Sequence, residues 1–142
     1  MPRASPGRRP YRGGMTNTIL LRRTLQANAT FSLLAALDLV LFGRQIASVV
    51  GAIGPRELTI LAVQLAVFAA WLLWLASRPA VPRGQVVAVI ALDLAWIAGS
   101  VLVIAFTPTL LPGGKWLIGI VADLVAVFAL LQWIGLRRLS MG

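Results

Sequence analysis

The sequence contains neither cysteine nor histidine. The absence of cysteine excludes disulfides, thiolate metal sites and cysteine nucleophiles. The absence of histidine removes imidazole ligands for haem or a metal ion and the usual proton shuttle near neutral pH. Carboxylates, amides and hydroxyls are therefore the only candidate site chemistry. We expect no metal, no cofactor and no enzymatic activity.

Acidic residues are also scarce: the 142 residues include four, which are Asp38, Glu57, Asp93 and Asp123. The chain is 59% hydrophobic and 12% charged, with a mean hydropathy of +0.89. Ordinary globular domains carry roughly twice this charged fraction. The three aspartates lie inside long apolar runs, where a carboxyl group is costly to insert into lipid and is by default a functional candidate.

Four apolar runs dominate the sequence, at residues 24–43, 58–77, 86–106 and 116–136. Each has the roughly 20 residues that a helix needs to cross a bilayer. The runs are continuously apolar rather than alternating, which argues against strands. We predict an all-α, four-helix transmembrane bundle over residues 23–138. A basic, disordered segment is expected at residues 1–22, and Met15 is an alternative start to Met1.

Basic residues predict the orientation of the bundle. Ten arginines lie on the side that carries both termini, whereas Arg44, Arg56 and Lys115 lie on the other. The positive-inside rule therefore places both termini in the cytoplasm of a bacterial inner membrane. The net charge of +9 is explained by this topology and by anionic lipid headgroups, so we expect no nucleic-acid partner.

Two short segments recur in the same order. Residues 36–39, Ala-Leu-Asp-Leu, recur at residues 91–94, and residues 66–69, Ala-Val-Phe-Ala, recur at residues 126–129. The order indicates two tandem copies of a two-helix hairpin with the same orientation. Chance matching of apolar tetrapeptides is the alternative, and the shared aspartate is the informative part.

Asp93 is the best candidate for a polar site within the membrane. Helical periodicity places Trp96 and Ser100 on its face, one and two turns further along the third run. One interpretation is a protonatable site or ligand pocket in which the indole N–H and the hydroxyl are donors. The other, which we favour, is an interhelical hydrogen bond together with a gap-filling tryptophan.

Asp123 and Asp38 are further candidates. Asp123 lies in the middle of the fourth run, and Asp38 lies near the outer end of the first, where it can reach Arg44 or interfacial water. Lower in the first run, Asn28 and Ser32 share a stripe that is typical of helix packing. If the three aspartates face one interior, no intramembrane Arg or Lys neutralises them, and such carboxyl groups either donate hydrogen bonds or carry protons.

Residues 28–32, Asn-Ala-Thr-Phe-Ser, and residues 93–100, Asp-Leu-Ala-Trp-Ile-Ala-Gly-Ser, carry a resemblance. With residues 131–138, they resemble a group of small four-span bacterial integral-membrane proteins of unassigned activity. The resemblance covers roughly residues 20–138. It implies the topology and draws attention to Asp93, Trp96 and Ser100, but implies no biochemical activity. In size the chain is also similar to small multidrug transporters and DoxX-like proteins. The transporters, however, use a glutamate in the first helix, where this chain has Asp38.

These observations favour a non-enzymatic structural or accessory membrane protein that forms a homo-oligomer or binds another membrane protein. The alternative is a small proton-coupled transporter that uses Asp93 with Asp123 or Asp38. Asp93→Asn separates the two, because it retains shape and hydrogen bonding but removes ionisation. A redox or lipid enzyme has no motif in its favour.

Overall fold

The computed structural model describes residues 13–140, which are arranged as four helices. The helices are α1 (Gly13–Val50), α2 (Pro55–Ser77), α3 (Arg83–Phe106) and α4 (Pro112–Ser140). All four are long and apolar enough to cross a membrane. The predicted all-α, four-helix bundle is confirmed, and its length and composition are those of a multi-pass membrane protein.

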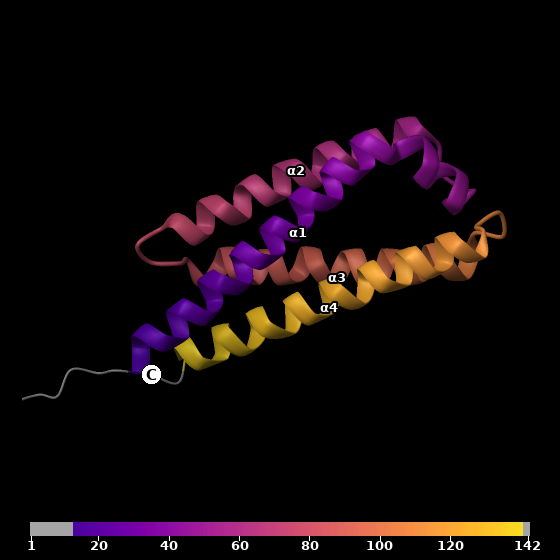
Figure 1. Cartoon of the computed structure of the whole chain (residues 1–142). Helices are drawn as coiled ribbons and strands as arrows, with labels where there is room; N and C mark the ends of the chain where they lie inside the picture. Colours follow the sequence, from indigo (N-terminus) through magenta and orange to yellow (C-terminus); the bar gives the residue numbers. More distant parts are fainter. Residues whose placement is uncertain (1–12, 141–142) are drawn as a thin grey trace, which may run out of the picture.

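Short turns separate the helices (Figure 1), and each turn contains or borders proline or glycine. Gly51 has a φ of 81°, and α2 begins at Pro55, where a missing backbone N–H is tolerated. Pro82 precedes α3, and Pro112 opens α4. Each turn is too short to cross the membrane, so neighbouring helices in the chain run antiparallel.

The first helix differs from the prediction at both ends. Residues 13–22 are helical rather than disordered, while residues 1–12 lie outside the described part of the chain. The reason is packing: Leu21 and Leu25 are fully buried against α2 and α3 in one apolar cluster. At the other end, non-helical backbone at Phe42 kinks the helix, which then continues to Val50.

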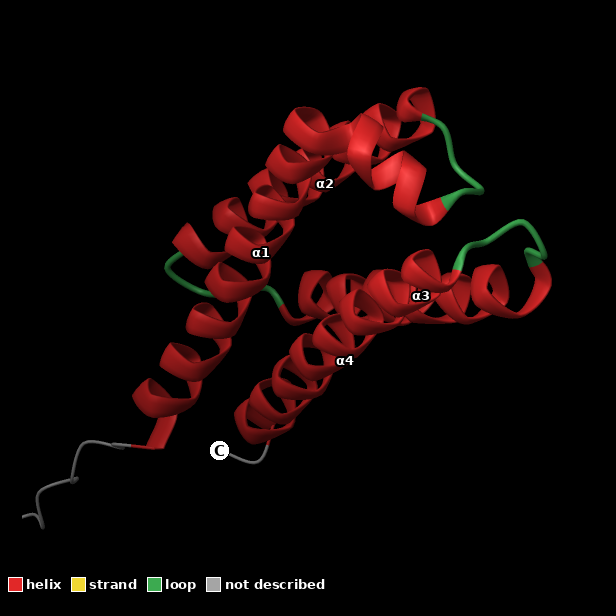
Figure 2. Cartoon of the chain, turned by 45° about the vertical axis from the view of Figure 1, so that its right-hand side comes forward, coloured by secondary structure: helices red, strands yellow, loops and turns green. Residues whose placement is uncertain are grey.

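The helices pack in the order α2, α1, α4, α3. The α1–α2 and α3–α4 hairpins are both present, in agreement with the tandem arrangement, and α1 lies against α4. By contrast, α2 and α3 make at most isolated close backbone approaches and diverge from their connecting turn (Figure 2). Their best-defined polar contact lies near that turn, where the Trp71 indole N–H donates to Gln85 Oε1 over 3.3 Å.

Arginines gather at the end of the bundle where α1 and α3 begin. This arginine-rich end carries Arg22, Arg23, Arg78, Arg83, Arg137 and Arg138. Here Arg22 Nη2 donates to the carbonyl oxygens of Arg78 and Pro79, at 2.5 Å and 2.6 Å. Arg83 likewise donates to the Leu139 carbonyl oxygen. The guanidinium groups thus tie α1 to the α2–α3 turn and the start of α3 to the end of α4.

At the opposite end the two hairpin turns meet. The Leu111 backbone N–H donates to the Val50 carbonyl oxygen over 3.0 Å. Gly114 lies so close to the Val50 backbone that a Cβ added there would stand 2.8 Å from Val50 Cα. The segment of α1 beyond its kink therefore bridges to the start of α4. The two hairpins are thus joined at this end by backbone contacts and at the opposite end by the α2–α3 turn.

Candidate functional site

Asp93 lies inside the bundle, with 4% of its surface exposed. Asn28 of α1 donates from Nδ2 to Asp93 Oδ2 over 3.1 Å. Ser32, one turn further along α1, donates to Asn28 Oδ1 over a longer distance of 3.4 Å. All three side chains are buried. They form a polar chain from α1 to α3, two helices that do not pack directly along each other.

Gln132 adds α4 to this polar group. Its side-chain amide is fully buried next to the Asp93 carboxyl group, outside regular hydrogen-bond geometry. Neither Gln132 Nε2 nor Oε1 has a hydrogen-bond partner within the described residues. Three helices therefore direct one carboxyl and two amide groups to a common point in an apolar bundle. We call Asn28, Ser32, Asp93 and Gln132 the polar cluster.

Trp96 and Ser100 lie one and two turns beyond Asp93 on α3, and neither side chain is hydrogen-bonded to it. The Ser100 hydroxyl donates to the Trp96 carbonyl oxygen over 2.8 Å, so it serves its own helix. The Trp96 indole N–H is buried without a partner in the described structure. In this arrangement Asp93 is bonded across the bundle by Asn28, rather than along its own helix by Trp96 or Ser100.

A pocket of about 230 Å³ lies against the polar cluster and is lined by residues from all four helices. Its polar lining consists of Asn28, Ser32, Gln64, Asp93 and Trp96. Its apolar lining consists of Phe31, Ala35, Leu61, Leu65, Phe68, Leu92, Val121 and Val125. Asn28, Ser32 and Asp93 are its most buried polar members, whereas Gln64 and Leu92 are exposed. The lining contains a carboxyl group and no basic side chain.

The structure does not bring the three aspartates together. Asp38 and Asp123 are exposed on α1 and α4, while Asp93 is buried. The condition under which all three would share one interior is therefore not met. Asp38 lies on α1 before the kink at Phe42, and Asp123 lies on α4 eleven residues after Pro112.

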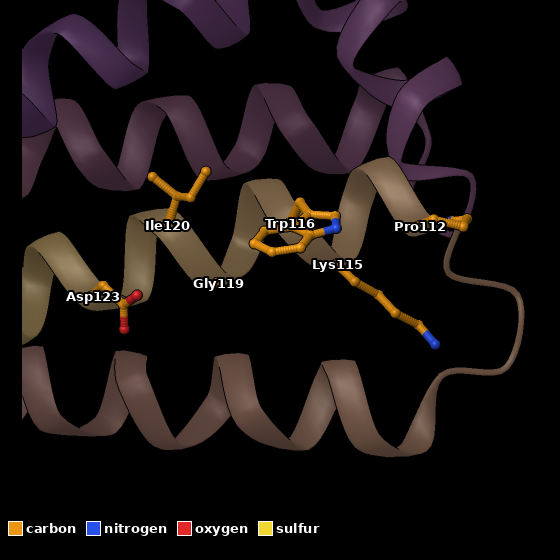
Figure 3. Close-up of a pocket in the computed structure, with 6 residues that line it drawn as sticks. All are labelled: Pro112, Lys115, Trp116, Gly119, Ile120 and Asp123. Carbon is orange, nitrogen blue, oxygen red and sulfur yellow. The ribbon is translucent and has the colours of Figure 1, made fainter.

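Asp123 belongs to a second, shallower pocket on the outer side of α4 (Figure 3). The side chains of Lys115, Trp116 and Asp123 project from this helix, and Gly119 leaves a hollow between Trp116 and Asp123. A Cβ built on Gly119 would meet nothing within 4 Å. This pocket is formed by a single helix, so it is a feature of the outer surface rather than an enclosed site.

Asn28 was visible in the sequence only as part of a packing stripe, and its bond to Asp93 was not predicted. One signal could have joined them. The helices α1 and α3 run in the same direction, and the two residues lie about 6 Å and 10 Å inside their predicted spans. Gln132 lies a similar distance inside the last span. Polar residues at one depth of a bundle are candidates for a shared contact.

Comparisons with protein-family models, curated proteins and solved structures found no match. The site is therefore interpreted from its own chemistry. Among residues 13–140 there is no group of three or more His, Cys, Asp or Glu side chains that could hold a metal ion. The polar cluster can fix the relative position of α1, α3 and α4, and its carboxyl group faces a pocket.

Proposed function

We propose that this multi-pass membrane protein has a non-enzymatic structural or accessory role, in which it associates with a second copy of itself or with another membrane protein. The observation that carries the proposal is the exposure of Asp38 and Asp123 on apolar helices. An aspartate at the centre of a membrane span, as Asp123 is, costs about 2.5–3.5 kcal/mol to insert, and one nearer the end, as Asp38 is, costs less. A protein surface that covers it can supply hydrogen-bond donors that lipid chains lack.

The polar cluster supports the same proposal from the inside. Asn28 and Asp93 bond across the bundle, so the buried polar groups serve to specify helix packing. The remaining aspartates, which are exposed on the neighbouring helices α1 and α4, are left for contacts outside the monomer. An internal polar contact and external carboxyl groups together fit a subunit whose surface is completed by a partner.

Association should therefore depend on the exposed carboxyl groups. We expect Asp38→Leu combined with Asp123→Leu to lower the associated fraction at least tenfold, because the carboxyl groups that bond the partner are gone. The bundle itself should insert as well as the wild type or better, since two intramembrane acids are removed. Light scattering in mild detergent and cross-linking in native membranes, with identification of captured membrane proteins, measure the effect.

Glu57→Leu is the matched control, because Glu57 is also exposed but lies in the first turn of α2, at the edge of the apolar region. This variant should associate like the wild type. A wild-type protein that is monomeric by both measurements and captures no membrane protein would contradict the proposal. So would an Asp38→Leu, Asp123→Leu variant that associates normally.

We further propose a bacterial inner membrane and cytoplasmic termini. The support is the arginine-rich end, which carries six basic residues of the described chain, against Arg44, Arg56 and Lys115 at the opposite end. Two of its arginines also lie over tryptophan rings, with Arg78 Cζ 3.9 Å from the centre of the Trp74 ring and Arg137 Cζ 5.8 Å from that of Trp133. Such pairs suit the headgroup level of a membrane with anionic lipids.

The absence of cysteine permits a direct test of orientation. A single cysteine at Thr109, in the α3–α4 turn, should react with a membrane-impermeant maleimide on intact spheroplasts. A single cysteine at Ser140, at the end of α4, should react only after the membrane is permeabilised. Mass spectrometry of the labelled protein gives the result. The reverse pattern would place the termini outside, against the distribution of arginines.

Proton-coupled transport is the second candidate, and its specific support is the pocket beside Asp93. It is less favoured because Asp38 and Asp123 lie on outer surfaces. Asp93 is thus the only aspartate of the described chain in the interior, and the three carboxyl groups do not form a path through the bundle. Association with a partner therefore explains the positions of Asp38 and Asp123, which proton-coupled transport through the bundle does not.

A further inference from the structure

We propose that the pocket beside Asp93 binds a small lipophilic ammonium compound, which reaches it from the bilayer through an opening between α2 and α3. This site is independent of the association proposed above, because that association depends on carboxyl groups outside the pocket. The proposal is based on the charge of the pocket, on the chemistry of its walls and on the position of its exposed residues.

The pocket contains one group that can carry a charge, and that charge is negative. Asp93 is its sole ionisable lining residue, and neither Lys nor Arg is among the residues that line it. Asn28 donates one hydrogen bond to the carboxyl group but brings no positive charge. A buried carboxylate without a counter-charge is costly, and an ammonium group bound beside it would supply that charge. The chain thus leaves a place for a cation that its own residues do not fill.

The walls suit an organic cation rather than a metal ion. Three aromatic side chains, Phe31, Phe68 and Trp96, line the pocket, and aromatic faces attract ammonium groups by cation–π interaction. Leu61, Leu65, Val121 and Val125 complete an apolar lining. A metal ion would require several oxygen or nitrogen ligands, and a single carboxylate is too few. An ammonium group attached to an apolar body matches both parts of this surface.

Two lining residues mark the opening. Gln64 on α2 and Leu92 on α3 line the pocket and are also exposed, Leu92 by 51%. These helices diverge from their turn and do not pack along each other (Figure 2). The opening between them lies along spans that face lipid chains in a membrane. A compound dissolved in the bilayer can therefore reach Asp93 without crossing the headgroup region.

The volume limits the size of the ligand. At about 230 Å³, the pocket is smaller than the about 300–1,000 Å³ that is usual for drug-sized ligands. It suits an amine with a single ring, and 2-phenylethylamine is the probe of choice. A lipid acyl chain is the competing occupant, but it would bring no charge to the Asp93 carboxyl group, which would keep only its hydrogen bond from Asn28.

The test is equilibrium binding of radiolabelled 2-phenylethylamine to the purified protein in lipid nanodiscs, with empty nanodiscs subtracted. The wild type should bind the amine saturably and discriminate at least tenfold against 2-phenylethanol, which has the same shape without the charge. Asp93→Asn should weaken amine binding at least tenfold. Asp38→Asn and Asp123→Asn are matched controls that remove carboxyl groups outside the pocket and should bind like the wild type.

A second variant separates loss of the site from loss of the fold. Leu92→Trp adds bulk at the opening, where Leu92 is half exposed, and should reduce binding with Asp93 intact. Three results would overturn the proposal: no saturable binding by the wild type, equal binding of the amine and the alcohol, or unchanged binding in Asp93→Asn. Equal loss in Asp123→Asn would also overturn it, because it would show attraction to the surface as a whole.

Discussion

Gly114→Ala is expected to destabilise the bundle, and Gly119→Ala, five residues along the same helix, is not. A Cβ at Gly114 would stand 2.8 Å from Val50 Cα and 3.0 Å from the Val50 carbonyl oxygen. Both are backbone atoms at the end of α1, so neither can turn away as a side chain would. Relief requires that the α1 and α4 ends separate, and such overpacking typically costs about 1–3 kcal/mol.

The separation should have a further cost, because the hydrogen bond from Leu111 N–H to the Val50 carbonyl oxygen lies at the same contact. By contrast, a Cβ at Gly119 meets nothing within 4 Å, and alanine in a helix interior is favoured over glycine by about 1 kcal/mol in water. The two substitutions are chemically identical and should differ in sign. Thermal unfolding in mild detergent, followed by tryptophan fluorescence and circular dichroism, gives the comparison.

An equal effect of the two substitutions would contradict the close approach of α1 and α4. Gly113→Ala should have an effect between those of Gly114→Ala and Gly119→Ala. Its Cβ would lie 2.9 Å from Val49 Cγ1, which is a side-chain atom that a rotamer change can move. We expect a smaller loss of stability there than at Gly114, although the residues are adjacent. The three substitutions add the same methyl group, so the differences among them report what each position of α4 contacts.

The spans could be predicted from the sequence because lipid imposes a length and a composition on each crossing helix. The ends of α1 could not be. Leu21 extends its buried face beyond the predicted span, and the helix continues past the Phe42 kink to reach α4. Both extensions depend on tertiary contacts, which hydropathy along the chain does not report.

The recurring segments have identical residues, but only one of the two pairs has the same pattern of burial in both copies. Residues 66–69 and 126–129 have the same pattern of burial, residue by residue, on α2 and α4. Residues 36–39 and 91–94 do not, since Ala36 is buried where Ala91 is exposed, and Asp38 is exposed where Asp93 is buried. The helices α1 and α3 therefore present different faces to the core, although the two hairpins share their connectivity.

The rotation of each helix about its own axis decides how much of the polar cluster could be predicted from the sequence. Helical periodicity places Trp96 and Ser100 on the face of α3 that carries Asp93, because residues on one helix share a face by geometry alone. It could not show which side of α1 faces α3, and so it could not choose between Asn28 and Asp38 as the neighbour of Asp93. The apolar residues surround α3 almost evenly, which leaves its rotation to be set by packing.

Asn28→Leu is expected to destabilise the bundle by about 1–3 kcal/mol, because it leaves the buried Asp93 carboxyl group without its hydrogen-bond donor. Leucine has the same number and branching of side-chain heavy atoms as asparagine, so no cavity is created. The free energy of unfolding should fall because a buried polar group without a partner costs more than a hydrogen-bonded pair contributes. Gln26→Leu is the control, as Gln26 is a polar residue on the exposed side of the same helix, and its replacement should be neutral.

The double variant decides the interpretation. In Asn28→Leu with Asp93→Leu both partners are apolar, no unmatched carboxyl group remains, and most of the lost stability should return. The double-mutant cycle then gives a coupling energy that exceeds the experimental error, as contacting residues show and distant ones do not. If the double variant is no more stable than Asn28→Leu, the two side chains do not act as a pair. The polar cluster would then lose its role in holding α1 against α3.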